Sequence, residues 1–124
     1  AVRIWANIFV EQLSTETTLV LDGVGRRLGE AEMLSEALEF YGRERVEIIL
    51  IEVSRKWATE RLVGRGRGDD TPERITSRLD EFEKYTLDSI EHFRTRPGWV
   101  LHTINGEQTI ENVHKDILRA TNLA

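Results

Sequence analysis

Two stretches of the sequence combine aspartate, glycine and arginine in patterns that can hold a phosphate. In the first, residues 22–27 (DGVGRR), an aspartate follows an apolar run directly, and two glycines allow the backbone to approach a ligand closely. In the second, residues 61–78, arginines alternate with glycines ahead of an aspartate pair. A guanidinium group binds phosphate through paired N–H donors. Both stretches therefore predict sites for a small anion.

Each stretch also has a plainer interpretation. Residues 22–27 are typical of an ordinary strand-to-helix turn, and the glycines of residues 64–68 are typical of a flexible, solvated loop. An RNA-binding arginine–glycine segment is disfavoured, because the pattern does not repeat and few aromatic residues lie nearby.

The charge of the chain is uneven. The net charge of −5 disfavours a general nucleic-acid binder. Residues 55–78 hold seven basic and four acidic side chains, a charge of +3, whereas the ten basic and eighteen acidic residues elsewhere give −8. An arginine cluster on an acidic protein favours a compact anionic ligand over a long polyanion.

Composition removes several other classes of protein and site. The 124 residues contain no cysteine, which excludes disulfides and thiolate metal sites, and the three histidines have no paired metal-ligand spacing. No apolar run approaches the ~18 residues of a membrane span. No signal peptide is visible, so we expect a cytoplasmic protein with no membrane partner.

Helix and strand patterns alternate along the chain. Helices are expected over 1–13, 28–41, 54–63, from Thr71 through Phe93, and from Thr109 onward; strands are expected over 17–22, 46–53 and 99–104. The long central helix should bury Ile75, Leu79, Phe82, Ile90 and Phe93. Apolar strands separated by helices predict an α/β fold with a parallel sheet. Ligands of such folds bind beyond the carboxyl ends of the strands.

The motifs together resemble the adenylate kinase family of nucleoside monophosphate kinases. Leu19-Val20-Leu21-Asp22-Gly23 with Arg26 is similar to the family's Leu-Asp-Gly-Phe-Pro-Arg signature. Residues 63–73 (VGRGRGDDTPE) resemble the family's short lid, and residues 104–111 (INGEQTIE) resemble its last strand and turn. The resemblance runs in order over nearly all of the chain.

The resemblance implies roles at the monophosphate end of such a site. Arg26 would contact the phosphate of the monophosphate, with Gly23 and Glu30 in the same site. Asp22 would lie near Mg²⁺ and reach it mostly through water, with no direct metal ligand from the chain.

The resemblance also implies roles at the ATP end. Arg61 would stack on the adenine, while Gly106 and Gln108 would approach the base through their backbone. Three arginines would clamp the transferring phosphoryl group: Arg65, Arg67 and Arg78. Of these, Arg65 would also contact ATP. Asp69 and Asp70 would hold the clamping arginines in place.

The sequence departs from the family's pattern at three places, which involve four residues. Val24-Gly25 stands where the family has Phe-Pro, which changes the monophosphate pocket, and Arg27 replaces a serine or threonine. Glu30 replaces a glutamine that reads adenine. A carboxylate only accepts hydrogen bonds, so Glu30 suits a donor–donor edge such as that of guanine better; alternatively, it faces solvent.

No Gly-x-x-x-x-Gly-Lys-[Ser/Thr] phosphate loop occurs in the sequence. We therefore expect residues 1–124 to form one partial kinase core, the C-terminal two-thirds of the protein, with residues 64–73 as its short lid. The implied fold is the three-layer αβα arrangement of P-loop kinases, without its first strand. The strand over 46–53 should then pair in parallel with that over 99–104.

The expected activity follows from the resemblance. The full-length protein would be an adenylate kinase that transfers a phosphoryl group from Mg²⁺-bound ATP to AMP, whereas the 124 residues alone would be inactive. The alternative is a non-catalytic nucleotide-binding or assembly fragment. Its partner would be the missing N-terminal segment or another copy of the chain.

Overall fold

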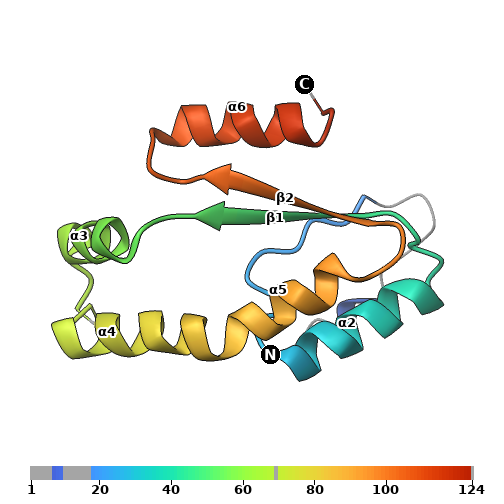
Figure 1. The fold of residues 1–124 in the computed structure, drawn as a ribbon, viewed down its shortest axis with the longest axis horizontal. Helices are drawn as coiled ribbons and strands as arrows, with labels where there is room; N and C mark the ends of the chain where they lie inside the picture. Colours follow the sequence, from blue (N-terminus) through green and yellow to red (C-terminus); the bar gives the residue numbers. More distant parts are fainter. Residues whose placement is uncertain (1–6, 10–17, 69, 124) are drawn as a thin grey trace. The chain divides into compact units, whose positions relative to one another are not determined.

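The computed structural model describes residues 7–9, 18–68 and 70–123, a mixed α/β chain (Figure 1). Its elements are α2 (Leu28–Phe40), β1 (Val46–Glu52), α3 (Arg55–Arg65), α4 (Pro72–Glu81), the π-helix η1 (Phe82–Thr86), α5 (Leu87–Arg94), β2 (Trp99–Asn105) and α6 (Ile110–Ala120). The chain divides into two compact units. The first unit comprises residues 1–46 and 85–99, and the second comprises residues 47–84 and 100–124. None of the described helices combines the length and the hydropathy that a membrane crossing requires.

The sheet consists of β1 and β2, which are parallel, hydrogen-bonded neighbours (Figure 1). This confirms the pairing predicted for residues 46–53 and 99–104. The turn before β2 requires a glycine: Gly98 has a φ of +77°, and a Cβ there would lie 2.7 Å from the carbonyl oxygen of Glu44.

The strand predicted over residues 17–22 is wrong for its described part. Residues 18–21 join no β-ladder, and Val20 is 86% exposed. Thr17 lies outside the described residues. The β-forming composition of this run is a weak preference, which becomes a strand only where a neighbouring strand completes the hydrogen bonds.

The helix starts follow from local sequence. The hydroxyls of the three predicted caps accept a hydrogen bond from the backbone N–H three residues onward, at 3.2 Å for Ser54, 3.4 Å for Thr71 and 3.3 Å for Thr109. Gly66, with a φ of +63°, ends α3 in the left-handed conformation. Of the helix predicted over residues 1–13, residues 7–9 are described and helical.

The long central helix is not a regular α-helix. Its backbone continues through α4, η1 and α5, with a π-turn in the middle. Ile75 and Phe93 are buried as predicted, and Leu79 and Ile90 are half-buried. Phe82, predicted to point inward, is 44% exposed. It opens the π-turn, which holds one more residue per hydrogen-bonded ring than α-geometry and so changes which side chains share a face.

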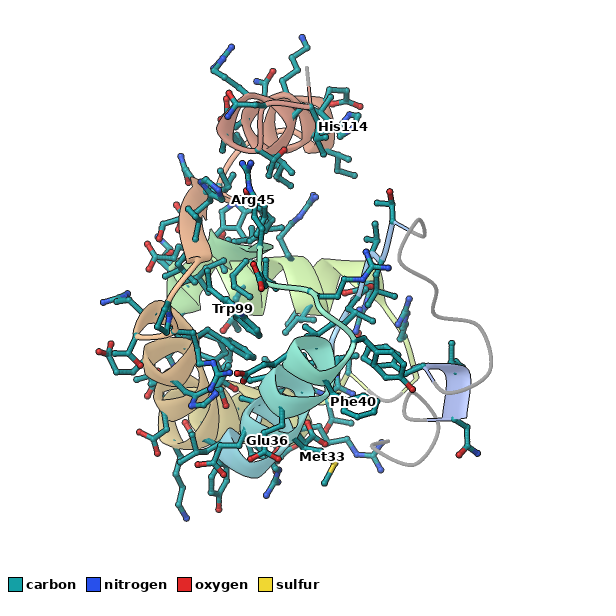
Figure 2. All side chains as sticks on the ribbon, turned by 90° about the vertical axis from the view of Figure 1, so that its right-hand side faces the viewer. Met33, Glu36, Phe40, Arg45, Trp99 and His114 are labelled. Atoms are coloured by element: carbon teal, nitrogen blue, oxygen red, sulfur yellow. The ribbon has the colours of Figure 1, made fainter. Side chains whose placement is uncertain are left out.

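The first unit has its core between α2 and α5. The buried apolar side chains there are Phe9, Ala31, Leu34, Leu38 and Phe93. Trp99, labelled in Figure 2, stacks on Phe93 with 5.6 Å between ring centroids. This packing fixes the start of α2, and with it the loop over residues 22–27.

Candidate functional site

A pocket of about 290 Å³ lies in the second unit. Its lining comes from α3, the turn after β2 and α6, and consists of Trp57, Arg61, Gly106, Gln108, Ile110, Val113, His114 (labelled in Figure 2) and Ile117. Three of these residues, Arg61, Gly106 and Gln108, are those for which the family resemblance implies contact with the ATP base. Residues more than forty positions apart in sequence thus meet at one cavity.

The turn after β2 is held tightly against β1. The N–H of Gly106 donates to the carbonyl oxygen of Glu52 at 2.8 Å. A Cβ at Gly106 would lie 2.6 Å from Val53 Cγ1 and 2.7 Å from Ile51 Cγ2. Only glycine fits here without displacing β1, so packing alone accounts for Gly106.

Glu107 joins the same turn to the start of α3. Its carboxylate accepts a hydrogen bond from the backbone N–H of Ser54 at 2.6 Å. The hydrogen bonds of Ser54, through its side chain and its backbone, hold the pKa of Glu107 below its usual value. The turn that supplies Gly106 and Gln108 to the pocket is therefore hydrogen-bonded to the start of α3, the helix that carries Arg61.

Two hydrogen bonds fix the orientation of the side-chain amide of Gln108. Its Nε2 donates to the carbonyl oxygen of Asn105 at 2.8 Å and to Asp116 Oδ2, also at 2.8 Å. Both amide N–H groups are thereby used, which leaves the Oε1 of Gln108 as the acceptor on this side chain.

Arg61 lies over the indole of Trp57, with 5.1 Å between its guanidinium carbon and the ring centroid. The two residues are four positions apart on α3 and so share one helix face. Arg61 is exposed, and it forms no ion pair with the part of the chain that the structure describes. Its charge is therefore available to a ligand.

Two arginines of the predicted clamp meet on one carboxylate. Arg65 donates from Nε and from a terminal nitrogen to Asp70, both at 2.9 Å, and Arg78 donates to Asp70 at 2.7 Å. The side chain of Asp70 is 1% exposed. Burial raises the pKa of Asp70, but the hydrogen bonds and charges of Arg65 and Arg78 outweigh that effect and hold it below its usual value.

The loop between these arginines presents a further cation. Arg67 is exposed and forms no ion pair within the described residues. Asp69, which the resemblance places beside Asp70, lies outside the described residues. The loop therefore carries more positive charge than Asp70 neutralises, which suits a phosphate.

Sequence reasoning gave no individual role to Arg55 and Trp57. Arg55 donates to Asp80 at 2.6 Å and to Glu83 at 3.0 Å, which connects the start of α3 to the end of α4 and to η1. Trp57 lines the pocket. The helical spacing of Trp57 and Arg61 was the available signal for the tryptophan; the partners of Arg55 depend on how α3 and α4 pack.

The predicted monophosphate residues lie in the first unit. The backbone bends at Asp22 and Gly23, and Gly23 has a φ of +72°. A Cβ at Gly23 would lie 2.7 Å from a terminal nitrogen of Arg26, so these two residues are brought together. Asp22 and Arg26 are exposed, whereas Glu30 is half-buried in the first turn of α2.

Two of the departures from the family signature have structural partners. Gly25 has a φ of +72°, and a Cβ there would lie 2.8 Å from Phe93 Cζ, so a larger residue would displace the core. The Arg27 guanidinium lies 4.6 Å from the ring centroid of Tyr85. The loop is therefore positioned by contacts with α5 and η1.

No protein-family model matches the chain. The adenylate kinase of Leuconostoc mesenteroides is 34% identical over 108 residues, which is 87% of this chain and 57% of that protein. Adenylate kinase 1 of Nostoc sp. is 33% identical over 112 residues, 90% of this chain and 59% of that protein. The adenylate kinase of Oenococcus oeni is 33% identical over 91 residues, 73% of this chain and 48% of that protein.

The chain thus spans little more than half the length of the curated relatives that it matches. The similarity to the first and second of these covers most of its residues. By sequence, the chain is a homologue of adenylate kinases that corresponds to a part of such a protein.

Proposed function

We propose that this chain carries the ATP-base pocket and the phosphoryl-clamping lid of a nucleoside monophosphate kinase. Its full-length form would be an adenylate kinase, which converts ATP and AMP to two molecules of ADP. The observation that carries the proposal is the pocket at which Arg61, Gly106 and Gln108 meet. The similarity to adenylate kinases supports the choice of reaction.

The base would enter the pocket beside Arg61. The apolar wall formed by Ile110, Val113 and Ile117 suits a flat aromatic ring, and the guanidinium of Arg61 can stack on that ring. Gly106 and Gln108 would meet the edge of the base through their backbone.

The phosphates would extend from the pocket toward the lid, residues 64–73. Arg61 and Arg65 are four residues apart on α3, so about 6 Å along the helix axis separates the base-stacking arginine from the first clamping arginine. Arg65, Arg67 and Arg78 would neutralise the charge of the transferring phosphoryl group, and Asp70 would keep two of them oriented. Phosphoryl transfer depends mainly on such positioning and charge stabilisation.

The loop at the start of α2 would receive the monophosphate. Arg26 would bind its phosphate, Gly23 would allow the close approach, and Glu30 would face the base. Glutamate in place of an amide supports acceptance of a base edge with two donors, such as that of guanine.

The resemblance implies Mg²⁺ bound together with ATP. Within the described residues, no group of three histidine, cysteine, aspartate or glutamate side chains could hold a metal ion. Asp22 offers one exposed carboxylate. These residues do not form a Mg²⁺ site of their own, and the proposed charge neutralisation rests on the arginines.

The proposed fold is that of a partial P-loop kinase core, with three αβα layers. The parallel pairing of β1 and β2 supports it.

Two observations favour a second function. The sequence contains no phosphate loop, and the chain spans little more than half of its relatives. A non-catalytic nucleotide-binding or assembly fragment, which needs the missing N-terminal half or another copy of the chain, would have these properties.

The test is calorimetric titration of the chain with ATP, together with a coupled assay for ADP formed from ATP and AMP. We expect saturable binding that Arg61→Ala weakens about tenfold, the effect of one desolvated cation–π contact. Arg94→Ala is the matched control, because Arg94 is an exposed arginine on α5 paired with Glu91 at 3.6 Å. The chain alone should bind ATP without turnover; turnover by the full-length protein in the same assay supports the kinase, its absence there supports the fragment, and an absence of ATP binding contradicts both.

A further inference from the structure

Trp57 lines the pocket but has no role in the function proposed above. Its indole is half-buried and lines the cavity together with Arg61. It does not belong to the buried core of the described residues. A large aromatic side chain that faces an open pocket, rather than the core, is a candidate ligand contact.

The indole also determines how Arg61 is presented. An unrestrained arginine side chain loses rotamer entropy when a ligand fixes it in one position. Stacking on Trp57, with 5.1 Å from guanidinium carbon to ring centroid, restrains Arg61 before any ligand arrives. The guanidinium is planar, so the face turned away from the indole can accept a second flat ring.

We propose that Trp57 is a positioning residue for the nucleotide base. The three groups form a stack in the order indole, guanidinium and purine, in which Trp57 acts through Arg61 and also forms a wall of the pocket. This inference rests on the proposed function, since it names a residue of the proposed ATP site. It goes further, because it makes the affinity for the base depend on Trp57, an aromatic residue outside the motifs quoted above for the family.

The stack predicts a spectroscopic signature. Titration with ATP should change the tryptophan emission of the chain, because the base enters the pocket that Trp57 lines. Inorganic tripolyphosphate, which lacks a base, should leave the emission unchanged. Trp57→Phe should still bind ATP in the calorimeter, within about threefold of the wild-type affinity, because phenylalanine retains an aromatic face. Its emission should no longer respond to ATP.

A matched control and a stronger variant complete the experiment. Trp99 stacks on Phe93 in the first unit, so Trp99→Phe should keep the ATP-dependent emission change. Trp57→Leu, which removes the aromatic face, should weaken ATP binding about tenfold, while Trp57→Phe largely restores it. Far-UV circular dichroism identifies any variant that fails to fold.

The outcomes separate this inference from the proposed function. If ATP binds and Arg61→Ala weakens it, but Trp57→Leu binds normally or the emission change survives in Trp57→Phe, the inference is wrong and the proposed function stands. If the wild-type chain does not bind ATP, both are overturned. A response to tripolyphosphate equal to that of ATP overturns the stack alone.

Discussion

Asp70 is the residue on which the arginine loop depends. It is a nearly buried carboxylate with Arg65 and Arg78 as hydrogen-bond partners, so it holds two cations that would otherwise repel each other. Its pKa is lowered in the folded chain, so its contribution to stability is present above its ordinary pKa of 3.8 and is lost as the pH falls through its lower folded value.

Substitution Asp70→Asn tests that role. At neutral pH the variant should melt at a lower temperature than the wild type, because the amide retains the shape but removes the charge that both arginines share. Below pH 3.8 the difference between the two melting temperatures should shrink toward zero, as the wild-type carboxyl becomes neutral as well. A difference that stays constant between pH 7 and pH 3 would show that the charge of Asp70 is irrelevant.

Arg78 should matter for catalysis more than for binding. In the proposed full-length kinase, Arg78→Ala should lower kcat by about 10³-fold, the scale on which an arginine stabilises a transferring phosphoryl group. Steady-state kinetics of the Arg94→Ala variant supply the baseline. A loss of less than about tenfold would remove Arg78 from the catalytic set.

Glu30 should set the choice of monophosphate. If its carboxylate faces the base, Glu30→Gln should shift the ratio of kcat/KM for AMP over GMP toward AMP by about 1–3 kcal/mol, the cost of leaving a buried polar group unpaired. The neighbouring Glu32, which is exposed on α2, provides the control Glu32→Gln. An unchanged ratio would mean that Glu30 faces solvent.

At this scale the sequence located the arginines and glycines but not their supports. The alternation of arginine with glycine pointed to the loop, and the structure brings Arg65 and Arg78 together on Asp70. Gln108 could be placed near the base, but its amide orientation depends on Asp116, eight residues away on α6. Contacts of that kind depend on the packing of elements, which spacing along the chain does not encode.

Among the elements, the turn after β2 is the most constrained. Gly106→Ala would drive a methyl group into Val53 and Ile51, and we expect a loss of about 1–3 kcal/mol in the free energy of unfolding, as for other overpacked sites. Gly64→Ala is the matched control: Gly64 lies within α3 and a Cβ there meets nothing within 4 Å. That change should stabilise the helix by up to ~1 kcal/mol. Urea unfolding of both variants measures the contrast, and equal effects would contradict the packing.

Elements with local signals were predicted well, and those that depend on distant partners were not. The caps Ser54, Thr71 and Thr109 are determined by a few neighbouring residues, and all three form the expected hydrogen bond. The run over 17–22 has strand composition but no ladder in its described part, because a strand needs a partner. The apolar spacing does not reveal the π-turn at Phe82–Thr86, because it predicts one uninterrupted helix there.

For the molecule as a whole, the proposed binding sites are divided between the two compact units. The proposed ATP-base pocket and the arginine loop belong to the second unit, and the predicted monophosphate loop belongs to the first. Family resemblance supplied this division of roles, since charge and periodicity alone indicated only an α/β protein with a site for a compact anion. The chain spans little more than half the length of the relatives that it matches.

The most direct test of the proposed nucleotide pocket is a ¹H–¹⁵N correlation spectrum of the chain titrated with ATP. We expect saturable shifts of the backbone amides of Arg61, Gly106 and Gln108, and of their neighbours on α3 and α6. The Arg61→Ala variant should need more ATP to shift the amides of Gly106 and Gln108. Amides in the first half of α2 should move little. If ATP leaves the pocket amides unshifted, or shifts mainly those of α2, the pocket is not a nucleotide site.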